Sequence, residues 1–161
     1  MTDSTKMPVI RRYQAGDHGA VWELHNLALG NTGALIGNGP WDDDFQHIET
    51  VYLTSGGEFL VGELDGRIVV MGALKPAGPE RADVKRMRVH PDFQRRGFGQ
   101  AMLNALEARA RKLGFRCLAL DTSTLQAAAR HLYRKNGYRE KGRRKIRHLD
   151  VIDYEKDLDE K

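Results

Sequence analysis

The chain has 161 residues, 40% of them hydrophobic and 30% charged, with a formal net charge of +4. This length and apolar content predict one compact domain over residues 1–161 with a single core. No apolar run approaches the roughly 20 residues that span a bilayer, and residues 1–8 lack the apolar centre of a signal peptide. We therefore expect a cytoplasmic protein with no membrane partner. Cys117 is the single cysteine, which excludes an internal disulfide.

The basic residues gather near the C-terminus, where six of the nine residues in 139–147 are Lys or Arg. A nucleic-acid-binding protein would more often spread basic residues over a face, with aromatic residues among them. The pattern therefore favours a solvated strand edge, and nucleic acid is not the expected partner.

In the N-terminal third, residues 9–13 predict a strand, followed by a helix capped by Asp17 and ended by Gly30. The glycine-rich segment 31–41 predicts a mobile loop. The three aspartates at 42–44 suit the first turn of a second helix over 43–53. We favour this capping role for them over a metal site, because no histidine or further carboxylate pattern completes a ligand set.

The rest of the chain predicts a mixed α/β fold. The pair Asp65-Gly66 is a turn signal between two strands and predicts a hairpin. A strand, a helix and a strand then form one crossover unit, which requires parallel neighbouring strands. The chain closes with a helix and two strands. The expected elements are the hairpin strands 58–64 and 67–74, the crossover unit of 82–90, 97–113 and 117–122, the helix 126–135, and two strands from Tyr138 that end near 151–158.

The run Gln94-Arg95-Arg96-Gly97-Phe98-Gly99-Gln100-Ala101 predicts a seat for a diphosphate. Its two glycines let backbone amides approach an anion, its arginines add positive charge, and the helix that follows offers its N-terminal dipole. The run lacks the Lys-Ser/Thr ending of a Walker A loop and the third glycine of a Rossmann fingerprint. It follows the carboxyl end of a strand, where open α/β sheets bind ligands.

These residues resemble the GCN5-related N-acetyltransferase (GNAT) family, whose diphosphate loop follows the pattern Gln/Arg-x-x-Gly-x-Gly/Ala. Gln94, Gly97 and Gly99 match that pattern. Met87-Arg88-Val89-His90-Pro91 resembles the family's fourth strand and its exit. Leu132-Tyr133-Arg134-Lys135-Asn136-Gly137-Tyr138 resembles the closing Leu-Tyr-x-x-x-Gly-Phe/Tyr. The diphosphate loop and the block 132–138 occur in the family's order, with the expected helices and strands around them.

The resemblance implies a single GNAT-like domain with a mixed, mostly antiparallel sheet of about six or seven strands and about four flanking helices. Its parallel fourth and fifth strands would splay apart, and a bulge in the fourth would turn an amide toward the thioester carbonyl. Acetyl-CoA would be the co-substrate, with no metal, and its pantetheine arm would lie in the gap between the two strands. The cofactor-binding residues implied are Met87, Arg88, Val89, Gln94, Arg95, Arg96, Gly97, Phe98, Gly99, Gln100, Gln126 and Tyr133.

The resemblance also implies catalytic roles. Tyr133 matches the family tyrosine that protonates the leaving thiolate, although its position also suits a core tyrosine. Asp83 lies where some relatives carry a glutamate base; it would act through a water or only neutralise a substrate ammonium. Glu58, Glu63 and His90 are the alternatives for the base.

The expected function is therefore acetyl transfer from acetyl-CoA to a primary amine of a small molecule, peptide or protein, by direct attack on the thioester. The alternative is a non-catalytic acyl-CoA-binding or sensor domain of the same fold. The acceptor stays open, because Asp42, Asp43 and Asp44 would attract a cationic amine whereas Arg143, Arg144 and Arg147 would attract an acidic one. A homodimer formed through the last strands is also possible.

Overall fold

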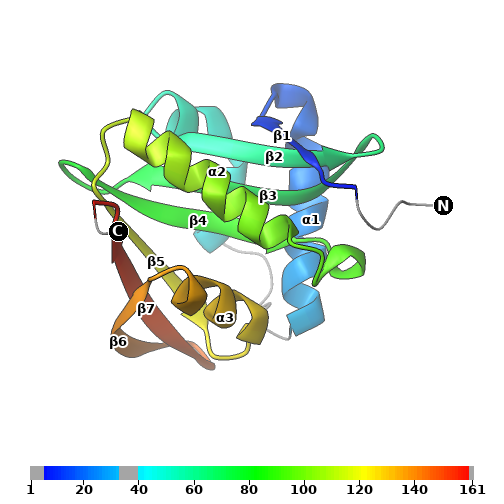
Figure 1. Cartoon of the computed structure of the whole chain (residues 1–161). Helices are drawn as coiled ribbons and strands as arrows, with labels where there is room; N and C mark the ends of the chain where they lie inside the picture. Colours follow the sequence, from blue (N-terminus) through cyan, green and yellow to red (C-terminus); the bar gives the residue numbers. More distant parts are fainter. Residues whose placement is uncertain (1–5, 33–39, 160–161) are drawn as a thin grey trace.

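A computed structural model describes residues 6–32 and 40–159, which form a seven-stranded sheet in the order β1-β2-β3-β4-β5-β7-β6 (Figure 1). Only β4 and β5 are parallel neighbours. The expected mixed, mostly antiparallel sheet is thus confirmed. The strands are β1 (Val9–Arg12), β2 (Glu58–Leu64), β3 (Arg67–Pro76), β4 (Arg81–Val89), β5 (Cys117–Ser123), β6 (Arg139–Ile146) and β7 (Leu149–Asp157), and the α-helices are α1 (His18–Thr32), α2 (Phe98–Lys112) and α3 (Ala127–Lys135).

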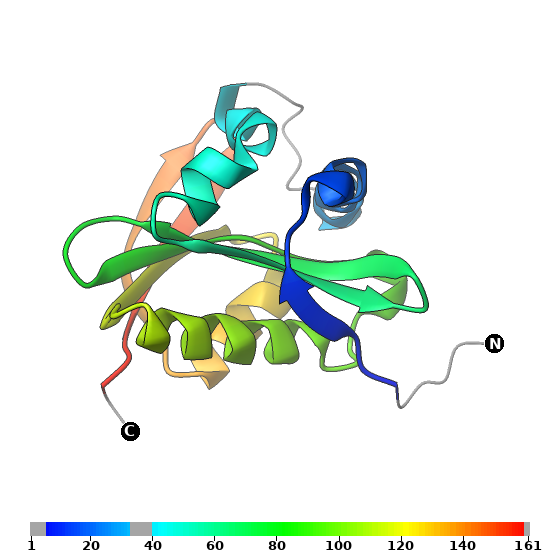
Figure 2. The same ribbon diagram turned by 90° about the horizontal axis from the view of Figure 1, so that it is seen from above.

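The helices cover both faces of the sheet, α2 and α3 on one and α1 on the other (Figure 2). The alternation of strand side chains builds a core on each face. On β3, for example, Val70 and Leu74 pack in the cluster under α2, whereas Met71 and Ala73 pack in the cluster under α1. No helix in the described part of the chain is long and apolar enough to cross a membrane.

Several predicted boundaries hold, and the hairpin is confirmed. Its turn residues Asp65 and Gly66 have positive φ angles of 51° and 81°, as a two-residue hairpin turn requires. Gly97 is the N-cap of α2, whose apolar side chains are buried at helical spacing. β6 is an exposed edge strand, as its composition predicted.

The predicted start and end of the first helix need correction. Asp17 closes a 3₁₀ turn (η1, Ala15–Asp17) ahead of α1, where its carboxylate accepts the Gln14 amide at 2.8 Å. The helix passes Gly30 and ends at Thr32. Residues 33–39 of the predicted loop lie outside the described residues.

The predicted α-helix over 43–53 is wrong. The chain forms a 3₁₀ helix (η2, Pro40–Gln46) and a short π-helix (η3, Glu49–Leu53) instead. Phe45 and Tyr52 are buried under the sheet, and the Asp44 carboxylate bonds to Arg86 of β4. These tertiary contacts override the helical propensity of the segment.

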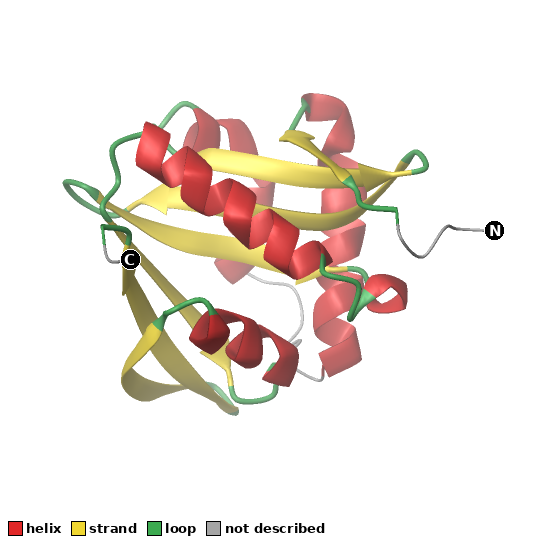
Figure 3. Ribbon diagram, viewed as in Figure 1, coloured by secondary structure: helices red, strands yellow, loops and turns green. Residues whose placement is uncertain are grey.

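β4 and β5 diverge, as the resemblance implied (Figure 3). They pair only over Arg81–Cys117, Ala82–Leu118 and Asp83–Ala119. Further along, β4 carries a bulge, because its register against β3 shifts between Met71 and Ala73 and Arg86 has a φ of 57°. One edge of β4 beyond Asp83 is therefore left without a neighbouring strand.

Candidate active site

The predicted diphosphate loop has the geometry of an anion seat. Gly97 takes the left-handed conformation with a φ of 82°, and its carbonyl accepts the first helical hydrogen bond of α2, from the Ala101 amide at 3.0 Å. The amides at the start of α2 therefore have no partner within the helix and point out of its N-terminus. A Cβ on Gly99 would make ordinary contacts, 3.4 Å from Leu132 and 3.5 Å from Val89, which shows that α2 begins beside β4 and α3.

Two glutamines fix this loop from either side. The Gln94 side chain donates to the Val89 carbonyl at 3.0 Å, which ties the loop to the end of β4. The Gln100 amide exchanges two hydrogen bonds of 2.9 Å with the Asn136 side chain at the end of α3. The side chains of Gln94 and Gln100 shape the loop, so the backbone amides of the loop are the groups left to bind a phosphate.

The two arginines of the loop differ. Arg95 is exposed and has a φ of 63°. Arg96 is half-buried, and its guanidinium lies 5.1 Å from the Phe93 ring centre and 5.3 Å from that of Phe98. Arg95 is thus free to reach an anion in solution, whereas Arg96 is anchored on two aromatic rings.

The gap edge of β4 presents backbone groups from Met87 and Val89. The His90 amide donates to the Val69 carbonyl of β3 at 2.8 Å, so the alternating antiparallel pattern turns Val89 away from β3. The Met87 carbonyl faces the same way and accepts Arg88 Nη1 at 2.8 Å. The structure thus places both predicted residues where an extended ligand could add to the strand.

A cavity of about 570 Å³ lies beside this edge. It is lined by residues from β4, β5, α3 and the 41–52 segment, including Met87, Gln126 and Tyr133. The Tyr133 side chain is only 4% exposed, and burial raises its pKa above the usual value of 10. The phenol therefore stays protonated at neutral pH and can donate a proton inside the cavity.

Gln126 is the N-cap residue of α3, but its side chain turns back toward β5. Its Oε1 accepts Thr122 Oγ1 and the Ser123 amide, both at 3.0 Å. The carbonyl end of the side chain is thus held by β5, and the amide nitrogen is left to donate to a ligand in the cavity.

The predicted base does not share this cavity. Asp83 lies at the last β4–β5 pair and lines a separate surface cavity with Asp121, which borders both. Glu58 is 1% exposed and pairs with Arg12 and Arg109, both at 2.9 Å.

The other two alternatives also lie outside the cavity that Tyr133 lines. Glu63 pairs with Arg11 at 3.4 Å, and His90 Nδ1 accepts the Asp92 amide at 3.1 Å.

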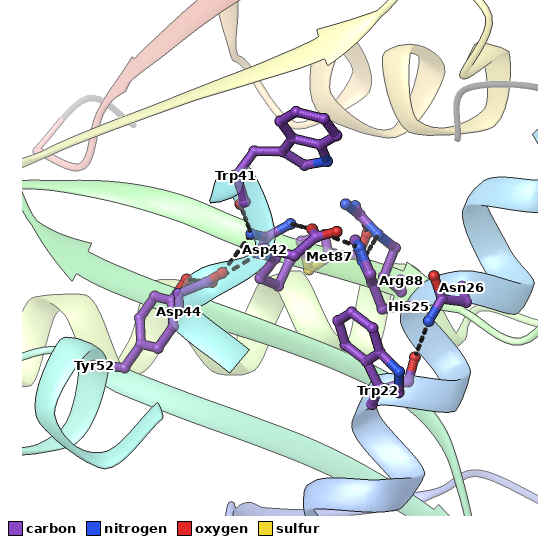
Figure 4. Close-up of polar contacts among 10 residues, drawn as sticks. Trp22, His25, Asn26, Trp41, Asp42, Asp44, Tyr52, Met87 and Arg88 are labelled. Atoms are coloured by element: carbon purple, nitrogen blue, oxygen red, sulfur yellow. Dashed lines mark hydrogen bonds and ion pairs between the residues drawn. The ribbon is translucent and has the colours of Figure 1, made fainter. Parts of the chain in front are cut away.

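A buried polar network, which the sequence did not predict, lines the same cavity (Figure 4). Arg86 joins both Asp44 oxygens at 2.6 and 2.8 Å, and it also reaches Asp42 at 3.4 Å. Tyr52 donates to Asp44, and His25 Nε2 donates to Asp42 at 3.0 Å. Asp42 and Asp44 therefore hold Arg86 and His25 in place, rather than only capping a helix.

His25 stays neutral in this network. It is 1% exposed, and burial together with the positive charges of Arg88 and Arg86 lowers its pKa to about 4. With a proton on Nε2 for Asp42, its Nδ1 accepts Arg88 Nε at 3.4 Å. The only sequence signal for this residue is its place on the inner face of α1, three residues after Trp22.

Comparison with curated proteins finds relatives that are acetyltransferases. The chain is 33% identical over 87 residues to the amino-acid acetyltransferase of Azotobacter vinelandii, covering 53% of this chain and 19% of the relative. It is 35% identical over 85 residues to the IAA acetyltransferase of Azospirillum brasilense, covering 52% and 56%. The matched regions thus span between a fifth and just over half of these relatives.

Solved structures share the fold over nearly the whole chain. A GNAT-family acetyltransferase from Staphylococcus aureus Mu50 superposes with a TM-score of 0.85 at 22% identity, covering 93% of this chain and 98% of the other. The yncA protein of Salmonella typhimurium, solved with acetyl-CoA, has a TM-score of 0.79 at 22% identity, covering 97% and 96%. The family model described as "Acetyltransferase (GNAT) family" matches residues 19–138. The chain therefore belongs to the GNAT family of acetyltransferases.

Proposed function

We propose that the chain is an acetyl-CoA-dependent N-acetyltransferase that acts on a primary amine by direct attack on the thioester. One observation carries the proposal: the free edge of β4 runs from the glycine loop into the cavity that Tyr133 lines. The acyl carrier, the proton donor and the amine that accepts the acetyl group would thus meet at one place.

The described residues suit acetyl-CoA. The diphosphate would rest on the backbone amides of residues 95–100, with Arg95 free to add charge. The pantetheine arm would bond to the backbone of Met87 and Val89, and the Gln126 amide nitrogen would donate to it. That yncA was solved with acetyl-CoA supports this choice of ligand.

The transfer would proceed in one displacement. The nitrogen lone pair of a neutral amine forms the N–C bond at the thioester carbonyl, and the C–S bond then breaks. Tyr133 gives its proton to the leaving thiolate. The proton lost by the amine passes to Asp121, which borders both this cavity and that of Asp83. Asp83 would then assist only through water.

The test is release of free thiol from acetyl-CoA across a panel of amines, with Tyr133→Phe beside the parent. Amine-dependent release, lost in the variant, is the expected result. Tight binding of acetyl-CoA without turnover on any amine would instead identify a non-catalytic acyl-CoA-binding protein.

A further inference from the structure

We propose that the acceptor is an amine that carries a carboxylate, namely an amino acid, and that Arg88 binds this carboxylate. The inference rests on the proposed acetyl transfer and specifies its substrate class. Two neighbouring arginines of β4, Arg86 and Arg88, differ in the groups that they contact.

Arg86 forms ion pairs with carboxylates of the protein, whereas Arg88 forms none with the described residues. Arg86 makes ion pairs with Asp44 at 2.6 Å and with Asp42 at 3.4 Å. The contacts of Arg88 go to two neutral groups, the Met87 carbonyl at 2.8 Å and His25 Nδ1 at 3.4 Å. Among residues 6–32 and 40–159, no carboxylate lies within ion-pair distance of its guanidinium.

Arg88 also lines the cavity in which the proposed reaction takes place. It lines the same cavity as Tyr133, and the two groups are close enough for each to influence the pKa of the other. The nearby Asp121 carboxylate pairs with Arg144 of β6 at 2.6 Å and forms no ion pair with Arg88. A carboxylate that binds Arg88 must therefore come from outside the described residues.

The surroundings leave the charge of Arg88 poorly compensated. Burial and the positive charge of Arg86 lower its pKa to about 10. A guanidinium removed from water without a counter-ion is unfavourable, and a carboxylate relieves this with two parallel charge-assisted hydrogen bonds. Lys75 and Lys85 line the same cavity and form no ion pair with the described residues, which adds to its attraction for an anion.

Arg88 is held ready for such a ligand. His25 bonds to Arg88 Nε, and Asp42 bonds to the other ring nitrogen of His25, as Figure 4 shows. A guanidinium fixed in this way loses little side-chain entropy when a ligand binds. Arg88 and Tyr133 line one cavity of about 570 Å³, so the carboxylate and the amine of one small molecule can both lie within it.

The first experiment uses the unmodified protein. Thiol release from acetyl-CoA is measured with each of the common amino acids, with their carboxamides and with the matching amines that lack the carboxylate. We expect at least one amino acid to exceed its carboxamide and its amine by 30-fold or more in kcat/KM. If the carboxamides or the amines have kcat/KM values equal to or above those of the amino acids, the proposed carboxylate binding is wrong, whereas the acetyl transfer itself still holds.

The second experiment removes the charge. Arg88→Met should raise the KM for the amino acid at least 30-fold, change the carboxamide reaction much less, and keep the KM for acetyl-CoA. Arg88→Lys should restore part of the preference, and Arg116→Met, at an exposed position between α2 and β5 that does not line the Tyr133 cavity, should behave as the parent. Equal losses for acid and carboxamide in Arg88→Met would show a merely structural role.

A binding measurement needs no turnover. Calorimetry in the presence of coenzyme A should detect the N-acetyl form of the preferred amino acid, with binding at least tenfold weaker in Arg88→Met. If no acid is turned over, the N-acetyl forms of the common amino acids are the probes. If none of them binds the parent, the proposal is wrong. If they bind without turnover of any amine, the acetyl transfer itself is wrong.

Discussion

Arg86 and Asp44 form a two-point ion pair, with Nε–Oδ2 at 2.8 Å and Nη2–Oδ1 at 2.6 Å, between the bulge of β4 and η2. Arg86 has a φ of 57°, a conformation that non-glycine residues seldom adopt. The pair thus links the wall of the cavity to the place where β4 departs from regular pairing. It is largely shielded from water, since each side chain is 15% exposed.

Breaking this pair should destabilise the fold. Asp44→Asn leaves the Arg86 guanidinium with only Asp42 as a counter-ion, so we expect the free energy of unfolding in urea to fall by about 2–3 kcal/mol. Asp150→Asn, which removes an exposed partner of Lys145, is the control and should cause no measurable change. Equal effects of the two substitutions would show that the Arg86–Asp44 pair does not stabilise the wall.

His25 should make stability depend on pH. Its pKa is about 4 in the folded chain and 6.5 in the reference state, so between these values the unfolded chain binds a proton that the folded chain does not. The contribution of His25 to the free energy of unfolding is therefore fully present above pH 6.5. It should fall by about 3 kcal/mol as the pH drops to 4.

The measurement is urea unfolding at several pH values, with variants compared to the parent. His25→Gln should flatten this part of the profile, although its overall stability is lower because it loses the bond to Asp42. His148→Gln, at an exposed histidine, should keep the parental slope. An unchanged slope in His25→Gln would mean that His25 is not the group responsible.

Substitution of a glycine in the diphosphate loop should affect both the stability of the fold and the binding of acetyl-CoA. Gly97→Ala places a side chain at a φ of 82°, which costs about 1 kcal/mol and crowds the anion seat. We expect the KM for acetyl-CoA to rise at least tenfold. Gly66→Ala is the matched control, because Gly66 has a φ of 81° in the hairpin turn. It should cost similar stability with an unchanged KM; a parental KM in Gly97→Ala would refute the seat.

Much of the fold was predictable because local signals agreed with the tertiary arrangement. The turn pair Asp65-Gly66, the N-cap Gly97 and the alternation along β3 each carry their own geometry in the sequence. The glycine loop and Tyr133 were found through motifs whose spacing reflects a strand, a helix start and a helix face.

The acceptor side was not predictable in the same way. Asp44 reaches Arg86 across 42 residues, and His25 reaches Arg88 across 63, so no local period reveals either contact. The Asp44–Arg86 contact belongs to the segment 43–53, where 3₁₀ and π segments replace the expected helix. The side on which Asp83 faces depends on where β4 and β5 part, which composition does not encode.

Substitution of Asp121 and substitution of Asp83 should change the rate of acetyl transfer to different extents. If Asp121 accepts the proton of the amine, Asp121→Asn should lower kcat/KM about tenfold at neutral pH and change the acidic limb of the pH–rate profile. Asp83→Asn, outside the Tyr133 cavity, should shift the profile little. The reverse ranking would return the role of base to Asp83.

Tyr133 and Tyr138 provide a matched pair of phenols, with ring centres 5.6 Å apart. The Tyr138 hydroxyl bonds to Glu107 at 2.9 Å, whereas no described residue hydrogen-bonds to that of Tyr133, which lines the cavity. Tyr133→Phe should therefore lower kcat about 100-fold with the KM for acetyl-CoA nearly kept. Tyr138→Phe should lower stability by about 1–2 kcal/mol and leave kcat near the parental value. Equal kcat values for Tyr133→Phe and the parent would remove Tyr133 as the proton donor.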